Sequence, residues 1–257
     1  MSDPDFQFGK KVFFLNPPGV LSDVASTLSA HEFEVYLVHN HKNLARFLKK
    51  EPHALVFVNI DEGMSEPEWE AWIRGLQGDP GTASVGIGVV TLLGDPEISR
   101  KYLMDVGITC GFVTLKIGAS KTADILLKTL EANEARGRRK YVRAACPAGT
   151  AEFSVPSGDA VLRGTVQDLS TVGMAAWFES AAELPVGTRL RDLQLTLRGA
   201  RILLNGIVVG KRSGGDGPPV QVVMFEPGSL TDEKREKTRS YIRRVLQDEV
   251  NRRLETA

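Results

Sequence analysis

Cysteine, net charge and long apolar runs are all scarce in this chain of 257 residues. Its two cysteines, Cys110 and Cys146, are too few for a disulfide framework or a four-ligand zinc site. No apolar run approaches the ~20 residues that a helix needs to cross a bilayer, and residues 1–11 lack the apolar core of a secretory signal. These absences predict a cytoplasmic protein. They argue against membrane insertion and against a secreted, disulfide-rich scaffold.

Charge is unevenly distributed along the chain, although 32 Lys and Arg balance 32 Asp and Glu overall. Residues 1–135 hold 12 basic and 18 acidic side chains, and residues 136–257 hold 20 and 14. The apolar fraction of 42% is ordinary for a globular protein, so the chain can bury a core. Two domains would explain the asymmetry, and a basic second half suits an anionic ligand.

The first half alternates short apolar segments with amphipathic stretches of helical length. Near-continuous apolar strands separated by helices predict a parallel sheet that is covered on both faces. Five such units in about 125 residues predict a flavodoxin-like, doubly wound α/β domain over residues 1–125. The predicted strands are residues 11–15, 34–38, 54–60, 85–93 and 110–115.

The order and spacing of these segments resemble the receiver domain of two-component response regulators. That family phosphorylates an Asp at the end of the third strand and holds Mg²⁺ with two acids after the first strand. Here these positions fall on Asn59 and on Asn16 and Pro17. Thr91 and Lys116 match the switch Thr and the phosphate-pairing Lys of the family. The resemblance therefore implies a pseudo-receiver that keeps the fold and has lost the acidic residues.

Loss of phosphorylation follows from the chemistry of these side chains. An amide is a far poorer nucleophile than a carboxylate, and neither Asn nor Pro supplies a hard anionic ligand for Mg²⁺. Asp61 and Glu62 lie two and three residues beyond the expected acceptor, which leaves a shifted acceptor as an alternative. We expect no phosphoryl transfer.

The second half changes to short alternating segments with turn residues between them. Six such strands predict a compact antiparallel β-barrel. A C-terminal helix over residues 230–257 follows, with Ser229 or Thr231 as its cap and an apolar stripe at helical spacing. We expect this barrel with its helix over residues 144–257, and a linker helix that carries an arginine motif over residues 126–143. The predicted strands are residues 151–155, 160–169, 173–178, 189–197, 200–212 and 219–225.

Two motifs at the start of this barrel are similar to motifs of a known family. The first is the RxxxR of Arg139 and Arg143, which Arg138 precedes, and the second is the DxSxxG of residues 168–173. Together and in this order, over about residues 136–250, they resemble the PilZ domain family, which binds the bacterial second messenger cyclic di-GMP. The resemblance implies a six-stranded PilZ-type barrel with a nucleotide ligand and no other cofactor.

The resemblance assigns a role to each motif residue. Arg139 and Arg143 would contact guanine edges and phosphates, and Arg138 would add positive charge. Asp168 would accept hydrogen bonds from a guanine edge, Ser170 would hydrogen-bond a base or a phosphate, and Gly173 would let the backbone turn and approach closely. These residue types suit the ligand, because an Arg fork matches guanine O6 and N7 and a carboxylate suits N1–H and N2–H.

Each motif also has a purely structural interpretation. A basic run such as residues 137–143 is typical of a solvated helix end, and DxSxxG is typical of a polar turn between strands. Trp177 is predicted to pack in the barrel core rather than to stack on a base. The four histidines have no ligand spacing with Cys, Asp or Glu, so no metal site is expected.

The sequence therefore predicts a non-enzymatic effector that senses cyclic di-GMP and signals through domain orientation or contact with an unidentified protein partner. No nucleophile–base pair or phosphate-binding loop is recognisable. A ligand-independent adaptor built on the same two domains is the alternative. A nucleic-acid-binding regulator is disfavoured, because acidic residues interrupt the basic C-terminal helix at Glu233, Glu236, Asp248 and Glu249. Motility, exopolysaccharide production and virulence are the outputs that the resemblance implies.

Overall fold

The computed structural model describes residues 9–179, 184–214 and 217–256. Residues 1–8, on which the expectation about a secretory signal partly rests, lie outside the described residues. The chain divides into two compact units, one of residues 1–140 with 247–257 and one of residues 141–246. The predicted domain boundaries at 125/126 and 143/144 stay predictions.

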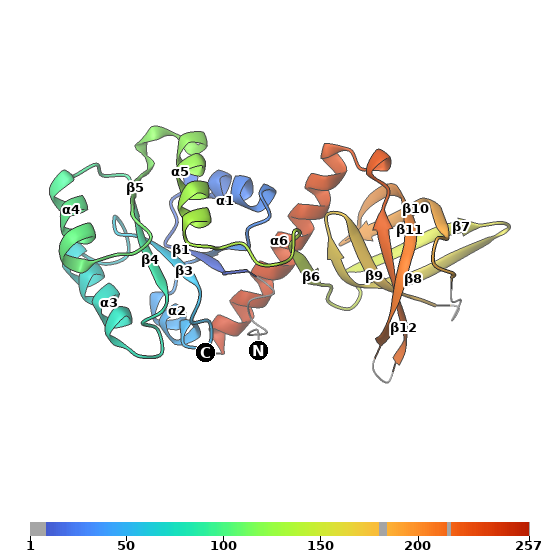
Figure 1. Cartoon of the computed structure of the whole chain (residues 1–257), viewed down its shortest axis with the longest axis horizontal. Coiled ribbons are helices and arrows are strands. Elements are labelled where there is room, and N and C mark those ends of the chain that lie inside the picture. Colours follow the sequence, from blue (N-terminus) through green and yellow to red (C-terminus); the bar gives the residue numbers. More distant parts are fainter. Residues whose placement is uncertain (1–8, 180–183, 215–216, 257) are drawn as a thin grey trace. The chain divides into compact units, whose positions relative to one another are not determined.

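The first unit is built on a parallel sheet with the strand order β2-β1-β3-β4-β5 (Figure 1). Every residue of β1 and β3 is buried, because helices cover both faces of the sheet. This confirms the predicted flavodoxin-like fold. The strands are β1 (Val12–Leu15), β2 (Val35–Val38), β3 (Leu55–Asn59), β4 (Gly86–Thr91) and β5 (Phe112–Thr114). The helices are α1 (Val20–Ala30), α2 (His41–Leu48), α3 (Glu66–Gly78), α4 (Pro96–Arg100) and α5 (Ala119–Ala132).

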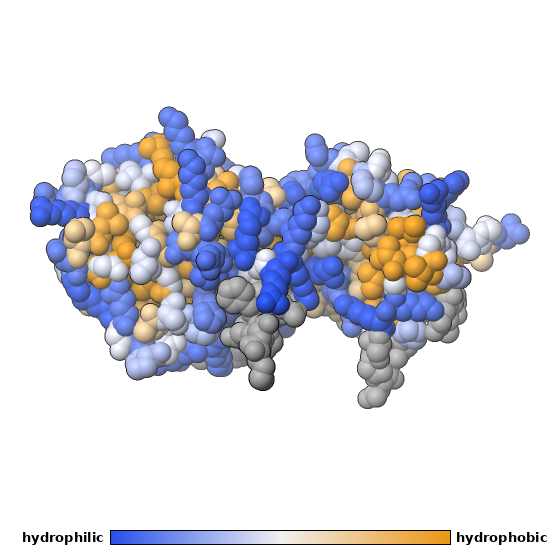
Figure 2. Space-filling model, in the orientation of Figure 1, coloured by the Kyte–Doolittle hydropathy of each residue, from blue (hydrophilic) through white to orange (hydrophobic). Residues whose placement is uncertain are grey.

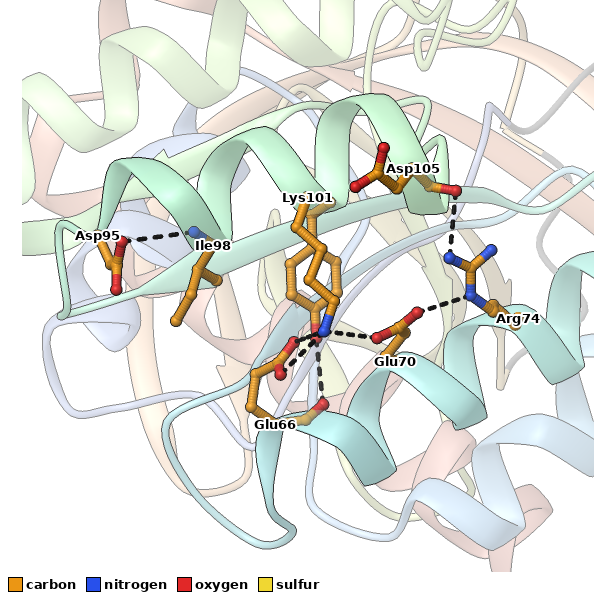
Figure 3. Close-up of polar contacts among 8 residues, drawn as sticks. Glu66, Glu70, Arg74, Asp95, Ile98, Lys101 and Asp105 are labelled. Atoms are coloured by element: carbon orange, nitrogen blue, oxygen red, sulfur yellow. Dashed lines mark hydrogen bonds and ion pairs between the residues drawn. The ribbon is translucent and has the colours of Figure 1, made fainter.

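A polar network ties α3 to the segment that follows α4. After Arg100 the chain forms one π-helical stretch, Lys101–Val106. Figure 3 shows the Lys101 ammonium between two carboxylates of α3, 3.1 Å from Glu66 and 2.5 Å from Glu70. The hydrogen bond to Glu70 is the main reason why the pKa of Lys101 is raised. Since these side chains are partly exposed, the network contributes about 1 kcal/mol or less per pair.

The second unit contains a closed antiparallel barrel of six strands. The barrel order is β8-β7-β10-β11-β12-β9, and pairing between β8 and β9 closes it. This confirms the predicted barrel. One short strand, β6 (Arg143–Ala145), pairs with β8 from outside the closed ring. The barrel strands are β7 (Ala151–Ser157), β8 (Ala160–Ser170), β9 (Gly173–Phe178), β10 (Arg189–Leu197), β11 (Ala200–Gly214) and β12 (Gly217–Phe225).

The expected linker helix does not carry the arginine motif. Helix α5 ends at Ala132 because Glu134 adopts a left-handed backbone with φ +51°, while the Ala135 N–H donates to Leu130 O at 2.9 Å. This hydrogen bond, together with that from Glu134 N–H to Glu131 O, is the pattern of a Schellman cap. The chain then continues without regular structure over residues 135–142. Arg138 and Arg139 consequently lie in an irregular connection rather than a helix, and Arg143 begins strand β6.

The last helix is α6 (Asp232–Glu255), as predicted. Its first turn is capped by Thr231, whose carbonyl accepts from Arg235 N–H and whose hydroxyl accepts weakly from Lys234 N–H at 3.4 Å. The division between the two units falls within this helix, between residues 246 and 247. Among the described residues, no helix combines the length and apolarity that a bilayer crossing requires.

Candidate ligand-binding site

Strand pairing brings the two sequence motifs together within the second unit. β6 and β8 are antiparallel, with Arg143 opposite Ser170 and Ala145 opposite Asp168. β8 then turns into β9, where Ser170 faces Gly173 across the hairpin. The second arginine of RxxxR therefore lies on a strand that pairs with the strand carrying Asp168 and Ser170 of DxSxxG, although 25 positions separate Arg143 from Asp168 in the sequence.

The carboxylate of Asp168 is shared by two guanidinium groups. Arg143 Nη1 lies 3.8 Å from Asp168 Oδ1, and Arg212 Nη2 contacts Asp168 Oδ2 in a close hydrogen-bonded ion pair. Arg212 Nη2 also donates to Gln167 Oε1 at 3.0 Å, which fixes its orientation. We call Arg143, Asp168 and Arg212 the arginine–aspartate cluster. The sequence motifs did not single out Arg212, because it lies near the end of the distant strand β11.

The arginine–aspartate cluster keeps excess positive charge at the surface. Its three side chains carry a net charge of +1, and both arginine side chains are 43% exposed. Lys211 is also exposed beside Arg212. Each guanidinium has five N–H donors, so one carboxylate satisfies only part of their capacity. The cluster can therefore bind an anion that brings several acceptors.

The hydroxyl of Ser170 forms hydrogen bonds within the β8–β9 turn. Ser170 is almost fully buried, and its Oγ donates to Gly173 O at 3.0 Å. The same Oγ accepts from Val172 N–H at 3.4 Å. This is the local hydrogen bonding that serine makes in polar turns, so in this structure Ser170 holds the β8–β9 hairpin in shape. The direct ligand contact expected of Ser170 stays a prediction.

Gly173 is needed for a close backbone approach rather than for an unusual φ. A Cβ atom at this position would lie 2.5 Å from Val223 O and 3.3 Å from Met224 Cα of β12. Its φ is not among the positive values that the described glycines adopt. Gly173 therefore allows β9 and β12 to pair tightly beside the arginine–aspartate cluster, while the expected approach of this backbone to a ligand stays a prediction.

Trp177 is not part of the barrel core, contrary to expectation. The core includes Met174, Ala176 and Phe178, the alternate residues of β9. Because side chains alternate between the faces of a strand, the half-buried Trp177 lies on the outer face with Ala175, which is opposite Asp168. Its indole N–H is buried and has no hydrogen-bond partner among the described residues. The indole N–H is therefore a buried, unsatisfied donor on the face that carries Asp168.

Arg138 and Arg139 are exposed and lie in the irregular connection before β6. They precede Arg143, the first residue of β6, by five and four residues. The structure thus joins Arg143, Asp168, Ser170 and Gly173 through strand pairing, and it leaves Arg138 and Arg139 outside regular structure.

Comparison with known proteins assigns the region that contains this site. The family model described as the PilZ domain matches residues 137–244. Residues 137–244 are therefore similar to a PilZ domain. The match includes both motifs and every strand of the barrel, and it leaves the parallel-sheet unit unmatched. No curated protein matches the chain.

Solved structures are similar to parts of this chain. Escherichia coli YcgR in complex with c-di-GMP is 19% identical with a TM-score of 0.41, over 47% of this chain and 51% of that chain. The match thus spans about half of YcgR. The chemotaxis response regulator CheY4 of Vibrio cholerae is 16% identical with a TM-score of 0.40, over 49% of this chain and 98% of that one.

We call the first unit the receiver-like unit, after the resemblance described above. Amide side chains, Asn16 and Asn59, occupy positions where that resemblance expects acids. Asn59 is fully buried at the end of β3, and its Nδ2 donates to Asn16 O at 2.8 Å. Asn59 Oδ1 accepts from Asp61 N–H at 3.2 Å. The carboxylate of Asp61 in turn accepts from Thr91 Oγ1 and from Leu92 N–H, both at 2.5 Å. The carboxylate of Asp61 is therefore held by internal donors.

We predict that the receiver-like unit accepts no phosphoryl group. Asn59 has no nucleophilic oxygen of useful strength, and an attack by Asp61 would break two short hydrogen bonds. Incubation with acetyl phosphate and Mg²⁺ should leave the intact mass unchanged. A gain of about 80 Da, the mass of one phosphoryl group, that disappears in the Asp61→Asn variant would establish a shifted acceptor and contradict this prediction.

Proposed function

We propose that the chain is a cyclic di-GMP-binding signalling effector whose ligand site is the arginine–aspartate cluster, together with Arg138, Arg139, Ser170 and Gly173. The observation that supports this most strongly is the β6–β8 pairing, which sets Arg143 beside Asp168 and leaves both side chains accessible. The PilZ match covers the same residues. The proposal assigns binding, and no catalytic step, to this protein.

Each group has a chemical task in this proposal. Arg139 and Arg143 meet guanine O6 and N7 with two parallel N–H donors or pair with phosphate oxygens. Asp168 accepts from guanine N1–H and N2–H. Arg138 and Arg212 add positive charge against the two phosphodiester groups. Ser170 and Gly173 keep the β8–β9 hairpin in the shape that positions Asp168.

The proposed output is a change of domain orientation or of contact with a protein partner. The irregular connection that holds Arg138 and Arg139 joins the two units, so a ligand that orders it acts on the link between them. The units are also joined by α6, which is continuous across residues 246 and 247. A reorientation therefore has to involve both connections. Motility, exopolysaccharide production and virulence are the proposed cellular outputs. The proposed location of the protein is the cytoplasm.

A ligand-independent adaptor remains the second candidate, and exposed apolar side chains favour it. Leu93 and Met104 are 58% and 75% exposed on the first unit, and Leu203 and Met224 are about half exposed on the barrel. Figure 2 shows apolar patches among the polar surface of both units. Such patches are typical of protein interaction sites. Titration with cyclic di-GMP discriminates, because an adaptor of this kind would not bind the nucleotide.

We predict that Arg139→Ala and Arg143→Ala each weaken cyclic di-GMP binding at least about tenfold. Each substitution removes charge-assisted hydrogen bonds to the ligand, worth about 1.5–3 kcal/mol apiece. Isothermal titration calorimetry of the full chain measures the affinities, with GTP and cyclic di-AMP as competing nucleotides. Arg191→Ala is the matched control, since Arg191 is an exposed arginine of β10 outside the two motifs. Parent-like affinity in both motif variants would refute the site assignment.

We predict that Arg212→Gln also weakens cyclic di-GMP binding, by about tenfold. The substitution lowers the net charge of the arginine–aspartate cluster from +1 to 0 and releases Asp168 from one of its partners. Lys211→Gln removes the same charge from the neighbouring residue of β11 and should reduce affinity much less, because Lys211 does not belong to the cluster. Equal losses in the two variants would show that Arg212 contributes only general surface charge.

A further inference from the structure

A second cationic feature of the second unit lies in a cavity between a hairpin and a helix. The cavity has a volume of about 250 Å³ and is formed by the β10–β11 turn and one face of α6. Lys237, Tyr241 and Arg244 follow each other at helical spacing on that face, and Arg198 comes from the turn. We call it the hairpin–helix cavity. Its complete lining is Leu197, Arg198, Ala200, Ile202, Lys237, Ser240, Tyr241 and Arg244.

The hairpin–helix cavity is electropositive. Three of its eight lining residues are cations, and none of the eight is acidic. Lys237 pairs with the exposed Glu233 one helical turn away at 2.7 Å, so these four charged groups together carry +2. Like charges that converge on one small volume repel each other, and a bound anion relieves that repulsion. A dianion would balance this charge.

The conformation of Arg198 is unusual for an arginine. Arg198 and Gly199 are the two central residues of the tight β10–β11 turn, with φ values of +46° and +87°. Positive φ at both positions is the geometry in which Asn-Gly is strongly preferred, because other side chains are strained there. The Arg198 N–H donates to Thr150 O at 2.8 Å, which anchors the turn. The turn therefore holds a guanidinium at the cavity despite an unfavourable backbone conformation, as happens at ligand-binding positions.

Tyr241 is an uncharged lining residue of the hairpin–helix cavity, and a hydrogen bond holds it in place. Tyr241 as a whole is 6% exposed, and its hydroxyl is hydrogen-bonded to Thr150 Oγ1 at 2.7 Å. Burial is the main reason why the pKa of Tyr241 is raised, so the phenol stays protonated at neutral pH. The charge of the hairpin–helix cavity thus comes from its three cations. Leu197, Ala200 and Ile202 add an apolar portion to the wall.

We propose that the hairpin–helix cavity binds a phosphate group, either free or as the monoester of a small molecule. Its volume is below the ~300–1,000 Å³ of sites that enclose whole small ligands, so it suits one anionic group. Donors approach from the turn on one side and from the helix on the other, which suits a tetrahedral dianion better than a planar carboxylate. The proposal is independent of cyclic di-GMP binding, because the hairpin–helix cavity shares no residue with the arginine–aspartate cluster.

Amide NMR of the full chain, titrated with inorganic phosphate at constant ionic strength, tests this proposal. Saturable shifts should appear at residues 198–200 and 240–244. Arg198→Asn and Arg244→Gln should each weaken this binding by about tenfold, whereas Arg201→Gln, an exposed arginine of the same hairpin outside the cavity, should not. No saturable shift at these residues, or parent-like binding in both cavity variants, would overturn the proposal. A parallel titration with O-phosphoserine identifies the source: tighter binding than inorganic phosphate indicates a monoester ligand, and weaker binding indicates the free ion.

Arg198→Asn also separates a binding role from a structural one. Asn is the favoured residue at this turn position, so the variant should melt at the same temperature as the parent or higher while it loses phosphate binding. Its affinity for cyclic di-GMP should equal that of the parent. A lower melting temperature would show that Arg198 serves the fold, which would contradict the argument from its strained backbone.

Discussion

The ion pairs of Asp168 with Arg143 and Arg212 join the parts of the structure on which the proposed function depends. Arg143 belongs to a strand outside the closed barrel, Asp168 to β8 and Arg212 to β11, so one carboxylate links three strands. The register of β6 on β8 places Arg143 there, and the close β9–β12 pairing at Gly173 supports the adjoining hairpin. A nucleotide that binds at this point contacts groups that the barrel already holds in place.

The two units differ in whether their charged and polar side chains are held by internal hydrogen bonds or lie at the surface. In the receiver-like unit the positions of the expected acids are occupied by Asn59, Asn16 and Pro17, and internal donors hold the carboxylate of Asp61. In the second unit the arginines of the arginine–aspartate cluster stay at the surface, where a ligand can reach them. The acidic first half and the basic second half of the sequence follow the same division. Recognition of an anion is therefore proposed for the second unit alone.

Much of the fold could be predicted from the sequence, because apolar periodicity marks buried strands directly. All five strands of the parallel sheet and all six of the barrel fall where apolar or alternating segments predicted them. The end of α5 did not follow from periodicity, since it depends on the left-handed backbone of Glu134 and on the Ala135 to Leu130 hydrogen bond. Strand β6 is three residues long and forms only because β8 is there to pair with it.

The candidate site was predictable to the extent that it is local in sequence. The two motifs indicated Arg143 and Asp168, and strand pairing brought them together. Arg212 could not be found in this way, because only the closure of the barrel brings β11 to Asp168. Trp177 was assigned to the core from its type, whereas the alternation of Met174, Ala176 and Phe178 would have placed it on the outer face.

A crystal structure of the full chain grown with cyclic di-GMP tests the central claim most directly. The account predicts nucleotide density against the outer face of β8 and β9, with guanine or phosphate oxygens within hydrogen-bonding distance of the Arg143 guanidinium and a guanine edge on Asp168. Nucleotide bound elsewhere on the chain, with the Arg143 and Arg212 pairs to Asp168 unchanged and in contact only with solvent, would contradict it.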